Sequence, residues 1–178
     1  MRSKLLLLVI LGLPSILCGQ TPRQIPPQAV DRIVKEVRHQ LIMLPYLDVF
    51  DNLTYSVNGY DVTLAGQVTN PTLKRDAENV VKHIEGVEKV VNQIEVLPLS
   101  TMDDGLRRQL YRAIYGFPAL EKYAMPVIKP IRIIVKNGHV TLEGVVDNQS
   151  DKDLAGLRAN GVSNVFSVTN NLVVVKGK

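Results

Sequence analysis

Two stretches of this chain carry the same pattern at a constant separation. Residues 54–68 contain Asn58-Gly59 and then Val-Thr-Leu-x-Gly, and residues 133–146 contain Asn137-Gly138 and the same five positions. Further on, five positions recur at the same offset of 78 residues, as Val87, Val90, Asn92, Ile94 and Val96 and again as Val165, Val168, Asn170, Leu172 and Val174. A constant offset over about 35 residues indicates that one structural unit occurs twice.

The first copy begins with a helix and a hairpin. Apolar residues three or four apart over 30–44 predict an amphipathic helix that Pro45 ends. The segments 53–57 and 62–68 alternate and are rich in β-branched residues, so both are expected to be strands. Asn58-Gly59 between them predicts a tight hairpin turn, because such turns need a positive φ.

A capped helix and a strand complete this copy. Asn70-Pro71 predicts a helix start, since Asn70 can accept from free N–H groups and Pro71 lacks one. This helix is expected to end at Gly86, and 89–97 reads as the last strand. The order helix, strand, strand, helix, strand predicts an α+β, two-layer αββαβ sandwich with a three-stranded sheet and two helices.

The second copy repeats this order after a short linker at 98–101. Its elements are expected as a helix with the stripe Leu106, Leu110, Ala113, Ile114 and Phe117, an insert over 115–130 with a helical turn at 119–124, hairpin strands at 131–136 and 140–146, a helix over 151–159 capped by Ser150, and a strand over 165–176. The predicted modules therefore span residues 30–98 and 103–176.

The N-terminus has the pattern of a signal peptide over residues 1–19. Arg2 and Lys4 precede nine apolar residues at 5–13, and a bilayer-spanning helix needs about 20. Residues 20–29 are rich in proline and are expected to form a flexible leader. These features predict an exported protein with a periplasmic location.

Cys18 is the only cysteine, so an intramolecular disulfide is impossible. It is either removed with the signal peptide or retained as the lipidated residue of a bacterial lipoprotein. Leu17 fits the second alternative poorly, because a small residue is expected immediately before a lipidated cysteine.

Charge is distributed unevenly between the two copies. The whole chain has a net charge of +4, and loss of Arg2 and Lys4 with the signal peptide leaves +2. Residues 31–98 carry seven basic and ten acidic side chains, whereas 103–178 carry eleven and seven. Only the second copy is therefore expected to be attracted to an anionic surface, and nucleic acid is not an expected partner.

The repeated motif resembles the BON domain family, whose name joins bacterial osmotic-shock and nodulation proteins. The resemblance rests on Asn-Gly, Val-Thr-Leu-x-Gly, a capped helix and the strand with Asn92 or Asn170. The second copy departs from the family pattern at Asn164, which stands where the first copy has Gly86. The resemblance implies exported modules with an αββαβ fold that bind phospholipid membranes or act as interaction modules in envelope proteins, without catalytic residues.

The sequence gives little indication of a catalytic site or a metal site. His39, His83 and His139 lack partners at ligand spacing. The acidic segment 147–153 lacks the central glycine and distal glutamate of a calcium loop, and its acids suit a helix N-terminus. We therefore expect a protein that is not an enzyme and needs no cofactor or metal.

The candidate binding surface is a basic face on and after the first helix of the second copy. Its cationic and aromatic side chains are Arg107, Arg108, Tyr111, Arg112, Tyr115, Lys122, Lys129 and Arg132. Lys122 stands there beside Tyr123. A basic face edged with aromatic rings can lie at a lipid headgroup surface, although the same arginines could simply be solvated.

The sequence thus predicts a binding protein that associates with phospholipid membrane surfaces or envelope components. The alternative is a protein–protein interaction module within a periplasmic or envelope assembly. Neither the oligomeric state nor the lipid headgroup follows from the sequence.

Overall fold

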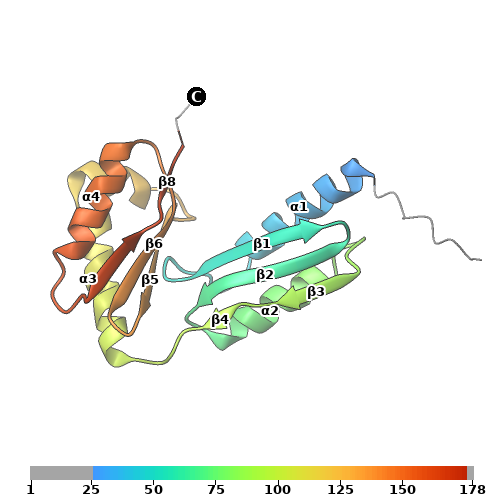
Figure 1. Ribbon diagram of the computed structural model, residues 1–178, viewed down its shortest axis with the longest axis horizontal. Coiled ribbons are helices and arrows are strands. Elements are labelled where there is room, and N and C mark those ends of the chain that lie inside the picture. The colour runs from blue at the N-terminus through green and yellow to red at the C-terminus, as the bar shows by residue number, and fades with distance from the viewer. Residues whose placement is uncertain (1–25, 176–178) are drawn as a thin grey trace, which may run out of the picture.

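The structure is a computed structural model that describes residues 26–175, and it consists of two αββαβ modules (Figure 1). The first module comprises α1 (Pro27–Ile42), β1 (Asn52–Asn58), β2 (Asp61–Val68), α2 (Pro71–Lys82), β3 (Lys89–Asn92) and β4 (Glu95–Val96). The second comprises α3 (Thr101–Tyr115), the 3-10 helix η1 (Pro118–Ala124), β5 (Ile131–Lys136), β6 (His139–Val146), α4 (Gln149–Asn160), β7 (Ser167–Asn170) and β8 (Val173–Val174). The predicted signal peptide and Cys18 lie outside the described residues.

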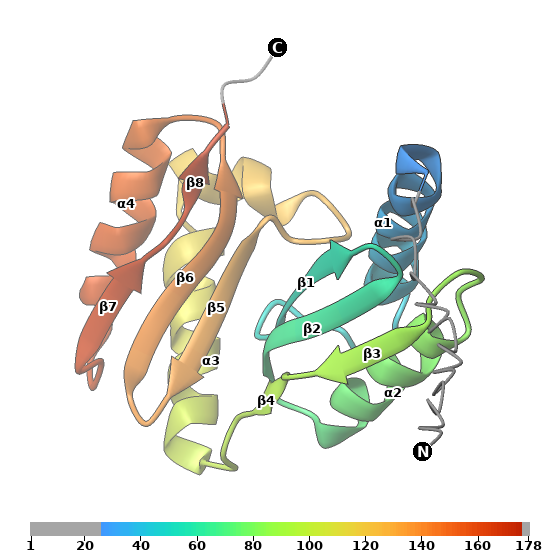
Figure 2. The same cartoon turned by 45° about the vertical axis from the view of Figure 1, so that its right-hand side comes forward.

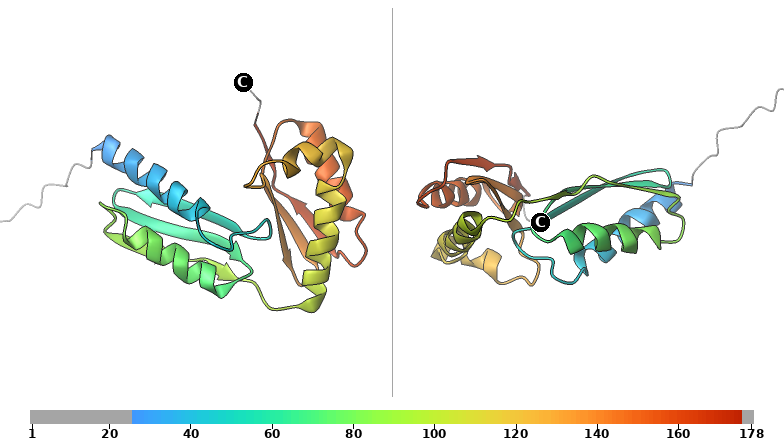
Figure 3. Two further views of the ribbon diagram at one scale, coloured as in Figure 1. Left: turned by 180° about the vertical axis from the view of Figure 1, so that it is seen from behind. Right: turned by 90° about the horizontal axis from the view of Figure 1, so that it is seen from below.

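Each module is a small mixed sheet with two helices on one face, as Figure 3 shows. The central strand, β2 or β6, pairs antiparallel with the strand before it and parallel with the two short strands that end the module. The predicted α+β class and the tandem order are confirmed. No helix in residues 26–175 is long and apolar enough to cross a membrane.

The final strand of each module is interrupted, which the sequence did not predict. The side chain of Asn92 donates to the carbonyl of Lys74 in α2 (2.9 Å) and accepts from the N–H of Ile94 (3.1 Å). Asn170 makes the equivalent contacts with Lys152 in α4 (2.7 Å) and with Leu172 (3.3 Å). The repeated asparagine therefore ties the strand to the helix at the point where the ladder breaks.

The two hairpins use different turns. In the second, Asn137 and Gly138 form the two-residue turn with φ of 52° and 78°, as predicted. In the first, Asn58 pairs with Asp61, so the turn residues are Gly59 and Tyr60 and only Gly59 (φ 64°) lies in the left-handed region. The first turn is therefore displaced by one residue from the predicted Asn58-Gly59.

Four predicted helix boundaries need correction, and one of them is the end of α2, which lies at Lys82 rather than Gly86. Helix α1 begins at Pro27, inside the expected leader, because proline suits a first helical turn, and it ends at Ile42 before Pro45 is reached. In α4 the cap is Asn148, which accepts from the N–H of Asp151 (2.8 Å), rather than Ser150. The cap of α2 by Asn70 is confirmed by its bond from the N–H of Thr72 (2.9 Å).

The backbone conformation of Asn164 explains how it can stand where the first copy has Gly86. Gly86 has φ of 93° and Asn164 has φ of 67°, so both copies place a positive φ before the last strand. Asparagine tolerates this conformation better than other residues with a side chain. The substitution therefore leaves the fold of the second copy intact.

Candidate functional site

The segment between α1 and β1 of the first module packs against the second module. The N–H of Ile133 in β5 donates to the carbonyl of Val49 (2.9 Å), and the guanidinium of Arg132 donates to the carbonyl of Asp48 (2.8 Å). Val49 is buried in the core of the second module rather than the first, and Phe50 packs against the same core. A segment of the first module thus covers the edge of the second sheet, as Figure 2 shows at the junction.

Asp51 holds this connection in shape. It is fully buried, and its carboxylate accepts from the N–H (2.7 Å) and hydroxyl (2.9 Å) of Thr69 and from the N–H of Asp48 (2.9 Å). Three donors satisfy the buried charge. The position of Val49 against the second module is therefore fixed from within the first.

A groove lies at this junction, which we call the junction groove. Its volume is about 580 Å³. Both modules line it, with Ile42, Leu47, Asp48, Val49 and Phe50 from the first and Arg108, Tyr111, Arg112, Val127, Ile128, Lys129 and Arg132 from the second. Its size and mixed lining are within the range of natural binding sites.

Four of the candidate cations meet in this groove, together with Tyr111. They are Arg108, Arg112, Lys129 and Arg132, and none of them forms an ion pair with another residue of the described chain. Burial lowers the pKa of Arg132, yet a guanidinium remains charged at neutral pH. The one acidic lining residue, Asp48, uses its carboxylate to accept from the N–H of Val49 (2.6 Å).

A second hollow of about 370 Å³ continues the groove along β1. It shares Ile42, Leu47 and Arg132 with the junction groove and adds Arg38, which is exposed on α1. The positive surface therefore extends onto the first module, although the charge count of that module is negative.

Two candidate residues prove to be internal. Arg107 is 5% exposed and donates to the carbonyl of Val135 (2.7 Å) and to the carboxylate of Asp104, whereas Tyr115 is 4% exposed and its hydroxyl donates to the carbonyl of Ile131. Both flank the apolar stripe of α3, and their long side chains reach the backbone of β5. The prediction that they belong to the exposed face was therefore wrong.

Lys122 is also absent from the groove. Its ammonium contacts the carboxylates of Asp147 (2.8 Å) and Asp151 (2.7 Å) and lies over the ring of Tyr123. These partners raise the pKa of Lys122. Lys122 thus neutralises part of the acidic segment 147–153. No cluster of three or more metal-ligating side chains exists in the described residues.

The network around Asp151 makes the free energy of unfolding depend on pH in the acid range. Asp151 accepts from the hydroxyl of Tyr123 (2.6 Å) and from the amide of Asn148 (2.9 Å). Burial alone raises the pKa of Asp151, but Lys122 and these donors outweigh it and leave the pKa below its ordinary 3.8. The folded state therefore binds this proton more weakly, so the stabilisation is present above that ordinary pKa and is lost as pH falls through the lowered one.

We expect D151N to lower the free energy of unfolding by about 1–2 kcal/mol at neutral pH and by less in strongly acid solution, below the lowered pKa, where the wild-type carboxylate takes up its proton. Urea denaturation at both pH values measures the difference. D153N, at an exposed position of the same helix, is the control and should show little change at either pH. An equal penalty for D151N at both pH values would contradict the assignment.

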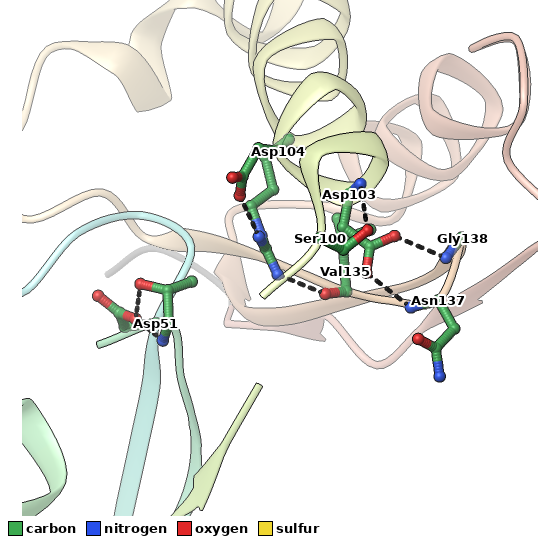
Figure 4. A network of polar contacts seen from close by, with 9 residues as sticks. Asp51, Ser100, Asp103, Asp104, Val135, Asn137 and Gly138 are labelled. Carbon is green, nitrogen blue, oxygen red and sulfur yellow. Dashed lines mark hydrogen bonds and ion pairs between the residues drawn. The ribbon is translucent and has the colours of Figure 1, made fainter. Parts of the chain in front are cut away.

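Asp103 is an organising residue that the sequence analysis missed. It is 1% exposed at the start of α3, and its carboxylate accepts from the N–H of Asn137 (2.8 Å) and of Gly138 (2.9 Å), as Figure 4 shows. It thereby fixes the hairpin turn of the second module to the helix that carries Arg108 and Arg112. An acidic residue in a first helical turn was the available signal, but capping alone explains that pattern.

Comparisons with known proteins find a family match and similarities to solved structures. The family model of the BON domain matches residues 29–98 and 119–176. No curated protein sequence matches the chain. Among solved structures, one of CdsD, a structural protein of the type III secretion system of Chlamydia trachomatis, is similar with 11% identity and a TM-score of 0.29, covering 83% of this chain and 94% of that one. Another, of the C-terminal domain of CdsD, has 13% identity, a TM-score of 0.29 and coverages of 80% and 97%.

Proposed function

Because this chain belongs to the BON domain family, whose model matches residues of both modules, we propose that it is a non-enzymatic binding protein of the bacterial envelope. It associates with anionic phospholipid surfaces through the junction groove. The observation that carries this proposal is the gathering of Arg108, Arg112, Lys129 and Arg132 in one hollow without ion-pair partners in the described chain.

Charge explains why such a surface selects anionic lipid. A cation near an anionic leaflet contributes on the order of 1 kcal/mol, and that contribution is screened by salt. Four cations in one groove therefore give about 4 kcal/mol at low ionic strength, which corresponds to weak and reversible attachment. Among the other cations described in the second module, Arg107, Lys122 and Lys136 are already paired with carboxylates.

We expect the protein from residue 20 onward to co-sediment with vesicles containing phosphatidylglycerol and not with pure phosphatidylcholine vesicles. The double variant R108E/R112E should bind at least about thirtyfold more weakly at low salt, since two favourable charges are lost. The control K35E/R75E changes the net charge equally at exposed helix positions outside the groove and should bind like the wild type. Equal weakening by both variants would mean that total charge, not the groove, governs attachment.

A protein partner in an envelope assembly is the second candidate. It is favoured by the edge of the second sheet, where β7 and β8 pair only with β6 in the described chain. Val145 and Val173 are exposed beside that edge at 45% and 58%. An extended segment of another protein could add to such an edge. Failure to sediment with any vesicle would direct attention to this edge.

A further inference from the structure

The junction groove is bordered by two apolar rims that the electrostatic proposal does not use. The first module presents Met43 and Tyr46, which are 67% and 78% exposed and follow Ile42 of the groove wall. The second presents Met125 and Val127, which are 81% and 97% exposed and precede Ile128 of the opposite wall. Apolar side chains this exposed on both sides of a groove are uncommon on a surface that contacts only water.

Both rims are held by the backbone. In the loop 125–129 the ammonium of Lys129 donates to the carbonyl of Pro126 (2.7 Å), which closes the loop on itself, and Pro126 and Pro130 restrict φ. Tyr46 has φ of 68°, a conformation that a bulky residue rarely adopts. The surrounding structure therefore holds the backbone of Tyr46 in this conformation.

The cations share the groove with apolar residues next to both rims. Arg108, Arg112 and Arg132 line it together with Ile42 and Leu47 of the first module and Val127 and Ile128 of the second. Figure 2 shows the loop after η1 extending from the second module toward the first. A surface that combines cations with exposed apolar side chains suits a leaflet, where phosphates lie outside and hydrocarbon lies beneath.

We infer that the two rims enter the hydrocarbon of an anionic leaflet while the groove cations contact the phosphates, so that both modules attach to the membrane at once. This inference rests on the proposed function. It adds that attachment has an apolar component that salt does not screen, and that Met43, Tyr46, Met125 and Val127 are the inserted side chains.

The absence of tryptophan from the sequence allows a direct test. The V127W variant places one tryptophan in the second rim. Its matched control, L157W, places one at a 69% exposed leucine on α4, which lies on the side of the second module away from the first (Figure 1). Each variant is mixed with phosphatidylglycerol-containing vesicles whose acyl chains carry bromine, and sedimentation is measured on the same samples.

Insertion predicts a blue shift and strong bromine quenching for V127W and neither for L157W. Sedimentation without a shift or quenching of V127W would overturn the insertion while leaving the electrostatic proposal standing. No sedimentation of either variant or of the wild type would overturn the proposed function and the insertion with it.

A second variant keeps the test independent of the probe. V127D should lower vesicle affinity about tenfold at moderate salt, the factor that loss of one buried side chain of this size gives. L157D is its control and should leave the affinity unchanged. Equal affinities of V127D and L157D would contradict the insertion.

Discussion

Replacing Val49 with aspartate is expected to destabilise the second module strongly, although Val49 belongs to the first. The side chain is 3% exposed in the core formed by residues of α3, β5 and β6. Aspartate would place a carboxylate there without a donor to satisfy it. An unpaired buried charge costs about 3 kcal/mol or more, which is a large part of the stability of a small domain.

The measurement is urea denaturation followed by amide signals of both modules in NMR spectra. We expect V49D to shift the transition of β6 amides strongly and that of β2 amides less, because Val49 packs in the second core only. Y46D is the control, since its ring is 78% exposed three residues away. If V49D left the β6 transition unchanged, the second module would be stable without the segment that covers its edge.

The sequence predicted the modules because their cores follow the repeat. Leu64 and Leu142 are both fully buried on the central strands, and Ile94 and Leu172 occupy matching buried places between the two short strands that end each module. It did not predict the junction. The contact from Arg132 to Asp48 joins residues 84 apart, and the segment 47–51 has no repeated counterpart whose pattern would indicate its partner.

The candidate site was predicted in part for a similar reason. Helical spacing places Arg108, Tyr111 and Arg112 away from the apolar stripe, and the structure brings these three to the groove. Helical spacing cannot show whether a long side chain beside the stripe extends into water or bonds to a backbone carbonyl. Arg107 and Tyr115 differ from expectation because they bond to carbonyls of β5. The partners of Lys122 in α4 and the loop before it were likewise beyond a local pattern.

The glycine of the Val-Thr-Leu-x-Gly motif has a backbone role that the sequence left unexplained. Gly66 and Gly144 have φ of 109° and 112° inside strands β2 and β6. A Cβ on Gly144 would lie 2.0 Å from the carbonyl oxygen of Pro130, and one on Gly66 would lie 1.9 Å from that of Asn52. The motif glycine therefore permits the close approach of the neighbouring strand, and it recurs for that reason.

We expect G144A to lower the free energy of unfolding by about 3 kcal/mol. A conformation open almost only to glycine costs about 1–3 kcal/mol for alanine, and the obstructed carbonyl of Pro130 must also move from the N–H of Val145, to which it is bonded at 3.1 Å. Because Pro130 leads directly into β5 and Arg132, the displaced strand should also weaken vesicle binding through the groove.

G105A provides the matched control for the same chemical change. A Cβ on Gly105 meets no atom within 4 Å, and the residue lies in helix α3. Alanine there should raise stability by up to about 1 kcal/mol, because glycine loses more conformational freedom on folding. Thermal and urea denaturation of the two variants should therefore change in opposite directions. A G144A protein as stable as the wild type would show that the strands can separate at this point, and the recurrence of glycine would then need another cause.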